Sequence, residues 1–294
     1  MEPMSIPLPC STEKLLPHRA PMRFIERLDG ITENGAYTGL TLPENHLFAM
    51  KNGCFDPLVF VELLAQLTAA HNGYLGLSRG ARGHMGYLVG LKHFTVEKRG
   101  CAGDLLQLSV KKETQFENVS YVKGMITCRD EMLAQGALKL WEQTGPSAPS
   151  HRSGPPAGMT EITETPDRFR EWQERSILHK AIIDCIQDIA FQPGRADVML
   201  GLHPDFIGFK GHFPGYPILP GVIMLKIAWV IAEMASKTAL TLREIKMAKF
   251  AKTILPGAVI KIECRHTVKK SYGHIDTVIM EKGKTCSRMV MITA

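Results

Sequence analysis

The chain has 294 residues, of which 45% are hydrophobic and 22% are charged, a balance that is ordinary for a globular protein with room for two domains. The net charge of +6 would suit an acidic partner, but no cluster of Lys and Arg with interleaved aromatic residues occurs, so we expect no nucleic-acid binding. The longest apolar run, Val222 to Ala235, is shorter than the ~20 residues that span a bilayer, and the N-terminus shows no targeting signal, so we expect a cytoplasmic protein without a membrane span.

The first half of the chain alternates apolar and polar residues in several segments, which predicts β-strands. These segments are 23–31, 36–42, 86–96, 105–114, 119–128 and 132–141. Between the second and the third of them, the apolar stretch from Pro57 to Gly76 predicts a helix.

A segment rich in Gly, Pro, Ser and Thr follows at 144–166 and is typical of an exposed linker. It divides the chain into an N-terminal domain, 1–143, and a C-terminal domain, 167–294. The second domain is predicted to hold a helix at 221–236 and strands at 195–202, 245–254, 259–267, 275–281 and 286–292. One helix followed by an antiparallel meander predicts an α+β fold with the sheet wrapped around the helix.

The same order of elements on both sides of the linker indicates an internal repeat. The string GLKHF at 90–94 is similar to KMAKF at 246–250. Any two α+β domains could share such an order, so the repeat alone does not decide the fold.

The seven cysteines are odd in number, widely scattered and without a C-x-x-C pair. We expect reduced thiols, no disulfide framework and no zinc site, and we expect no other metal or redox cofactor.

The string HFPGYPILPGV from His212 to Val222 resembles the core motif of the 3-hydroxyacyl-acyl carrier protein dehydratases, which are hotdog-fold proteins. In that family a catalytic Glu or Asp follows the histidine by fourteen residues, on the central helix. Here that position is Lys226. The second half therefore has the histidine of the motif without its acid.

The first half resembles the same family through LPHRAPM at 16–22 and VELLAQ at 61–66. Aligning the two helices places Glu62 opposite Lys226. The loop before Glu62 lacks HFPG, and its His46 lies sixteen residues before the acid. This half has the acid without a well-spaced histidine.

Together the halves resemble the dehydratase pair of aryl polyene biosynthesis, fused into one chain. The resemblance implies a double hotdog, a pseudo-dimer whose halves pair edge to edge. It also implies one complete catalytic site, with His212 from one half and Glu62 from the other. The related site of His46 and Lys226 would be inactive, with Lys226 reaching the interface edge or pairing with an acid.

The resemblance also assigns roles within the site. His212 would act as the base, and Glu62 as the acid, its carboxyl kept protonated by an apolar tunnel that raises its pKa. Gly221 would offer a backbone N–H at the start of the helix, and Gln66 would orient Glu62. His18 and Arg19 belong to a motif that is mostly structural in the family. The predicted substrate-binding residues are Phe213, Tyr216, Pro220, Gln66 and Gly221.

We therefore expect a 3-hydroxyacyl-[acyl carrier protein] dehydratase that forms trans-2-enoyl thioesters in fatty-acid-like or polyene biosynthesis. The alternatives are a hotdog thioesterase and a catalytically silent partner that binds an acyl group or a carrier protein. Two such chains could associate further as a homodimer. Basic residues that could receive an acidic carrier protein, or simply form a solvated face, are Arg79, Arg82, Lys92, Lys98, Arg99, Lys246, Lys249 and Lys252.

Overall fold

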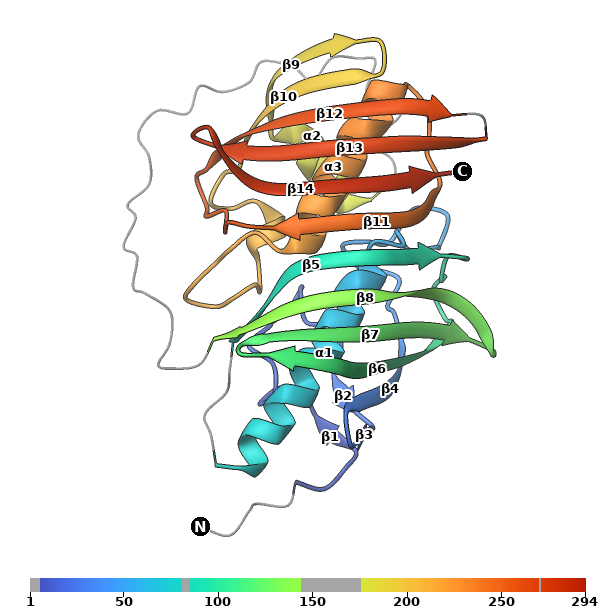
Figure 1. The fold of residues 1–294 in the computed structure, drawn as a ribbon, viewed down its shortest axis with the longest axis vertical. Coiled ribbons are helices and arrows are strands. Elements are labelled where there is room, and N and C mark those ends of the chain that lie inside the picture. The colour runs from blue at the N-terminus through green and yellow to red at the C-terminus, as the bar shows by residue number, and fades with distance from the viewer. Residues whose placement is uncertain (1–5, 81–84, 144–175, 270) are drawn as a thin grey trace.

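The computed structural model describes residues 6–80, 85–143, 176–269 and 271–294. Its two halves each place one long helix against an antiparallel sheet (Figure 1), as the sequence predicted. The expected linker, 144–166, and Arg82 lie outside the described residues.

The N-terminal half is built around helix α1 (Val59–Ser78). The helix is apolar on almost every side because sheet and loops surround it, and Leu63, Leu64 and Leu67 are fully buried. The strands of this half are β1 (Cys10–Ser11), β2 (Arg27–Leu28), β3 (Gly30–Thr32), β4 (Gly35–Thr41), β5 (Met85–Val96), β6 (Leu105–Phe116), β7 (Val119–Cys128) and β8 (Glu131–Gln143).

The C-terminal half is built around helix α3 (Gly221–Ser236), whose bounds match the prediction. Its other elements are α2 (Ile177–Asp184), β9 (Ile186–Gln192), β10 (Arg195–Gly201), the short 3-10 helix η2 (Ile207–Phe209), β11 (Leu242–Phe250), β12 (Val259–Lys269), β13 (Tyr272–Glu281) and β14 (Lys284–Thr293). The sequence analysis missed α2 and β9. It also extended β11 to Ile254, whereas the strand ends at Phe250 and the next residues turn toward a pocket.

The two halves share one sheet of twelve strands, with the order β3-β4-β6-β7-β8-β5-β11-β14-β13-β12-β10-β9. The junction is the antiparallel pair of β5 and β11, which lie side by side in the middle of Figure 1. Leu91 pairs with Ala248 and Lys92 with Met247, so the two similar strings of the sequence are the strands that join. A Cβ at Gly90 would lie 3.0 Å from the Ala248 carbonyl oxygen, which explains the glycine at this close approach.

The prediction that all thiols are unpaired is wrong for two cysteines. Cys54 and Cys101 form a disulfide across an isolated antiparallel bridge. The two residues are 47 positions apart in the chain, so no local spacing pattern could reveal the pair. They meet because the loop before α1 runs beside the loop between β5 and β6.

No helix among the described residues is both long enough and apolar enough to cross a membrane.

Candidate active site

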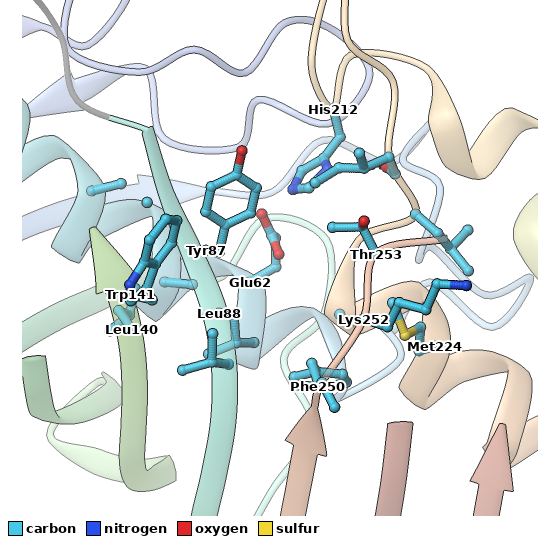
Figure 2. Close-up of a pocket in the computed structure, with 18 of the residues that line it drawn as sticks. Glu62, Tyr87, Leu88, Leu140, Trp141, His212, Met224, Phe250, Lys252 and Thr253 are labelled. Atoms are coloured by element: carbon cyan, nitrogen blue, oxygen red, sulfur yellow. The ribbon is translucent and has the colours of Figure 1, made fainter. Parts of the chain in front are cut away.

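A pocket lies between the two halves, next to the junction of β5 and β11 (Figure 2). Its polar end holds Glu62 from α1 and His212 from the loop before α3. The remaining lining residues come from α1 and α3, from the loops that precede them and from strand ends on both sides of the junction: His18, Ala65, Ala69, Gly86, Tyr87, Leu88, Val89, Leu140, Trp141, Ile218, Leu219, Gly221, Met224, Phe250, Ala251, Lys252 and Thr253.

The loop that carries His212 is held against the other half of the chain. The Arg19 N–H donates to the Gly211 carbonyl at 3.0 Å. Gly211 has a φ of +81°, and a Cβ there would lie 2.0 Å from the Arg19 carbonyl oxygen. A side chain at this position would therefore separate the two loops. The LPHR segment of the first half and the HFPG segment of the second half thus form one structural unit.

His212 itself is oriented by its own loop. Its Nδ1 lies 3.2 Å from the Ile218 carbonyl oxygen, and the Ile218 N–H donates to the His212 carbonyl at 2.9 Å. The Phe213 ring stacks on the imidazole with centroids 4.1 Å apart. Because a carbonyl oxygen only accepts, Nδ1 is the protonated nitrogen and Nε2 is left with a free electron pair.

Glu62 lies in the first turn of α1 and is 4% exposed. Its Oε1 accepts a hydrogen bond of 2.8 Å from Gln66 Nε2. Gln66 is itself fixed, because its Nε2 also donates to the Met22 carbonyl at 2.6 Å and its Oε1 accepts from the Phe24 N–H at 2.9 Å. The segment after the LPHR motif therefore sets the direction of the carboxylate through Gln66.

His18 is the third polar group of the pocket, although the sequence gave it no catalytic role. Its Nε2 lies 3.5 Å from Glu62 Oε1, and both side chains are buried. The His18 and His212 rings are 5.2 Å apart between centroids. One ligand-type atom from each of His18, Glu62 and His212 lies within 4.8 Å of the other two. In the sequence, the sign of this location was the membership of His18 in the LPHR motif, because nothing in the residue type itself indicated it.

The protonation of Glu62 differs from the expectation of a raised pKa. Burial does raise the pKa of this carboxyl, but the hydrogen bond and charge of His18, the charge of His212 and the hydrogen bond from Gln66 together lower it below its usual value. The two histidines come from loops outside α1, which is why the apolar helix sequence alone predicted the wrong direction for the Glu62 pKa.

Burial lowers the pKa of His212 to about 4, with a further contribution from His18 that the Glu62 charge and the Ile218 carbonyl partly offset. The imidazole is therefore neutral at pH 7. A neutral imidazole with a free Nε2 is the form that can accept a proton from carbon.

The other predicted binding residues fall into two groups. Gly221 lines the pocket, whereas Phe213, Tyr216, Pro220 and Gln66 are not among the residues that line it. Phe213 supports the His212 ring from behind, and Gln66 supports Glu62.

The wall of the pocket beyond the polar end is apolar. Ala65 and Ala69 follow Glu62 along α1, and the Tyr87 and Trp141 rings lie 5.7 Å apart between centroids on neighbouring strands. Figure 2 shows Tyr87 beside the Glu62 carboxylate and Trp141 farther from His212. An apolar chamber with acid and base groups at one end suits an acyl chain with one polar, reacting end.

The predicted second site, His46 with Lys226, is not assembled as a pair, because each residue has other partners. Lys226 Nζ lies 2.6 Å from Asp56 Oδ2, and both residues are buried. His46 instead packs on Phe24, with ring centroids 4.4 Å apart, and its Nδ1 accepts from the Phe48 N–H. The structure thus confirms that Lys226 pairs with an acid, and it separates His46 from that pair.

The nitrogen and carboxylate atoms of His18, Glu62 and His212 are close enough together to approach one divalent ion. The hydrogen bonds from Gln66 to Glu62 and from His212 to Ile218 would orient the same atoms in that case too. A chelator added to the activity assay distinguishes a metal-dependent site from a metal-free one.

Two helix-and-sheet halves that share one continuous sheet, with a pocket between them, define a double-hotdog protein. Residues 10–149 match the family model described as ApeP dehydratase, and residues 188–289 match the model described as ApeI dehydratase. The first half of the chain therefore belongs with the ApeP-like dehydratases, and the second half belongs with the ApeI-like dehydratases.

Curated relatives match a shorter stretch. The 3-hydroxyacyl-[acyl-carrier-protein] dehydratase FabZ of Geobacter metallireducens is 33% identical over 90 residues, which cover 27% of this chain and 60% of that protein. The chain spans less than two thirds of the length of this relative.

Two solved structures support the fold. The dehydratase domain of RzxB from Pseudomonas fluorescens aligns with a TM-score of 0.57 and 11% identity over 95% of this chain and 99% of that one. A putative oleoyl thioesterase from Lactobacillus plantarum aligns with a TM-score of 0.59 and 8% identity over 89% of this chain and 97% of that one. At such identities the likeness concerns the fold alone.

Proposed function

We propose that the chain dehydrates 3-hydroxyacyl thioesters, carried by acyl carrier protein, to trans-2-enoyl thioesters at one composite site. The observation that carries this proposal is the pairing of His212 and Glu62. They come from different halves, line one pocket and have an imidazole nitrogen and a carboxylate oxygen within 4.8 Å of each other. The match of both halves to dehydratase families and the matches to FabZ proteins support the same reaction class.

In this mechanism His212 removes a proton from C2 of the substrate. Nε2 is available because Nδ1 donates to the Ile218 carbonyl, and the low pKa keeps the ring neutral. Glu62 faces the 3-hydroxyl and supplies the proton with which the hydroxyl leaves as water. Each such proton transfer contributes roughly two to four orders of magnitude in rate.

The thioester oxygen gains negative charge as the C2 proton leaves, and it needs a hydrogen-bond donor. Gly221 is the first residue of α3 and lines the pocket. Backbone N–H groups in the first turn of a helix have no partner within the helix and carry the positive end of its dipole. A glycine there lets the thioester approach the backbone closely.

The acyl chain would lie along the apolar wall, and the carrier protein would dock outside. Of the basic residues predicted for docking, Lys252 lines the pocket and forms an ion pair with Glu281. Lys92, Lys246 and Lys249 are exposed on the joined strands β5 and β11. Their positive charge near the pocket would favour an acidic partner.

The test is enoyl formation from a 3-hydroxyacyl-carrier substrate by the full chain, with and without a chelator. We expect activity that the chelator does not remove, and losses of about 10²- to 10⁴-fold in kcat for His212→Ala and for Glu62→Gln. Glutamine keeps the shape of Glu62 and can still accept from Gln66, so folding should persist. Full activity in both variants would rule out the composite site.

The same assay separates the alternatives. A hotdog thioesterase would release the free carrier thiol and a hydroxy acid, with no enoyl product. A silent partner would leave the substrate unchanged while retaining a bound acyl chain.

A further inference from the structure

The proposed dehydration leaves the source of one proton open. Glu62 must pass a proton to the departing hydroxyl, yet its interactions with His18, His212 and Gln66 lower the pKa of its carboxyl, which is therefore ionised at neutral pH. The proton must therefore rest on a neighbouring group before the reaction. This inference rests on the proposed function and concerns that neighbour.

His18 is the buried group best placed for this purpose. Its Nε2 lies 3.5 Å from Glu62 Oε1, and its Nδ1 has no hydrogen-bond partner among the described residues. Among the described residues, the polar contact of the His18 ring is therefore the one between Nε2 and Glu62. Gln66 Nε2 contacts the same oxygen at 2.8 Å, so both contacts fall on Oε1 and leave Oε2 to face the substrate.

We propose that His18 is a positioning residue for Glu62, which stores the proton of the acid and fixes the carboxylate so that Oε2 faces the 3-hydroxyl. His18 needs no contact with the reacting atoms, because it acts through Glu62. The role differs from the structural one that its motif implies.

With His18 and Glu62 as a pair, every proton in the reaction has a donor and an acceptor. The C2–H bond breaks toward His212 Nε2, its electrons form the C2–C3 double bond, and the C3–O bond breaks with its own pair. The leaving oxygen takes a proton from Glu62, which has received the one from His18, and water departs. His212 then returns the C2 proton to Glu62, within 4.8 Å, and the pair regains its proton.

The other titratable groups of the pocket do not supply this proton. Burial and the neighbouring Tyr216 raise the pKa of Tyr87, so its phenol stays neutral. The Lys252 amine is paired with Glu281, and in Figure 2 it points away from Glu62. His212 must be neutral to act as the base. Of the titratable groups that line the pocket, His18 thus remains as the one that faces Glu62.

The experiment measures the protonation of Glu62 directly in the full chain. Isotope-edited infrared titration follows the carboxyl signal, with Glu62→Gln as the reference for subtraction. We compare the wild type with His18→Gln, which keeps a donor but no charge, and with the shorter His18→Asn. The matched control is His203→Gln, since His203 is an exposed histidine that does not line the pocket.

Both His18 variants should protonate Glu62 at a higher pH than the wild type, because burial still raises the carboxyl pKa while the opposing charge is gone. Their kcat should fall by up to about a hundredfold, with KM changed much less, and His203→Gln should match the wild type. A merely structural role would not move the Glu62 titration.

An unchanged Glu62 titration midpoint in both folded variants, or an unchanged kcat, would overturn the role of His18. The titration does not depend on turnover. A wild-type chain that fails to dehydrate would therefore overturn the proposed function separately, while the shift of Glu62 could still be measured.

Discussion

The two central helices, α1 and α3, carry equivalent positions, Glu62 and Lys226, in chemically different surroundings. Around Glu62 and His212 the chain assembles an acid, a base and a helix start with a glycine. Around Lys226 the corresponding place holds a buried ion pair with Asp56. Equivalent places in the repeated fold therefore hold different chemistry, the proposed site in one case and a buried ion pair in the other.

The two places differ in three residues, those at the positions of the proposed base, acid and backbone donor. Phe48, a fully buried core residue, stands fourteen positions before Glu62, where the other half has His212 before Lys226. Pro57 stands five positions before Glu62, where the other half has Gly221. Proline has no N–H, so this place cannot donate to a thioester oxygen. The second place therefore lacks the base, the acid and the donor.

The largest effect on stability should come from breaking the Lys226–Asp56 pair. In Lys226→Met the Asp56 carboxylate stays buried without its counter-ion, which costs roughly 3–5 kcal/mol. Chemical denaturation should show this loss in the free energy of unfolding. The pair joins the two halves, so the loss should affect both together.

The control is the double variant Lys226→Met with Asp56→Asn. Asparagine can still accept the 3.0 Å hydrogen bond that the Leu58 N–H donates to Asp56, and no charge remains buried. Most of the stability should return, because removing both charges of a buried pair is often nearly neutral. A single variant as stable as the wild type would show that the pair is not a structural contact.

A smaller effect, on catalysis, should come from Gly221→Ala. The added Cβ would lie 3.1 Å from the Phe250 ring and 3.4 Å from Leu88, so it narrows the pocket beside the proposed donor. We expect kcat/KM to fall by about ten- to a hundredfold, or about 1.4–3 kcal/mol. The matched change Pro57→Ala, in the other half, should leave kcat/KM within about twofold. Equal losses of kcat/KM in Gly221→Ala and Pro57→Ala would contradict a donor role that belongs to Gly221 alone.

The sequence was sufficient to pair His212 with Glu62, because each half carries a recognisable fragment of one motif and the fragments complement each other. It also predicted both central helices, whose apolar runs are long and continuous. The edge strand β9 escaped detection because it alternates half-buried and exposed positions without a strong apolar face.

What the sequence could not supply were contacts between distant segments. Asp56 and Lys226 are 170 positions apart, and Cys54 and Cys101 meet only because two loops run side by side. The direction of the Glu62 pKa depends on His18, which follows from loop docking rather than from helix composition. Local patterns locate elements, whereas the charge state of a buried group depends on everything packed around it.

The smallest effect distinguishes the two histidines, His212 and His46, by their tautomers. Burial lowers the pKa of each ring to about 4. A histidine with a lowered pKa stays neutral until the pH falls through that value, so both rings should remain neutral at about pH 5.5, where a histidine of pKa ~6.5 is mostly charged.

Their protons nevertheless lie on opposite nitrogens. His212 donates from Nδ1 to the Ile218 carbonyl, whereas His46 accepts at Nδ1 from the Phe48 N–H, so its proton lies on Nε2. Nitrogen chemical shifts of the labelled rings should show these two tautomers, and kcat/KM should hold level down to about pH 5 and fall as His212 becomes charged near pH 4. An acid limb near the ordinary histidine value of ~6.5, or a His212 ring with its proton on Nε2, would contradict the assignment of His212 as the base, because only a free Nε2 can take the proton from C2.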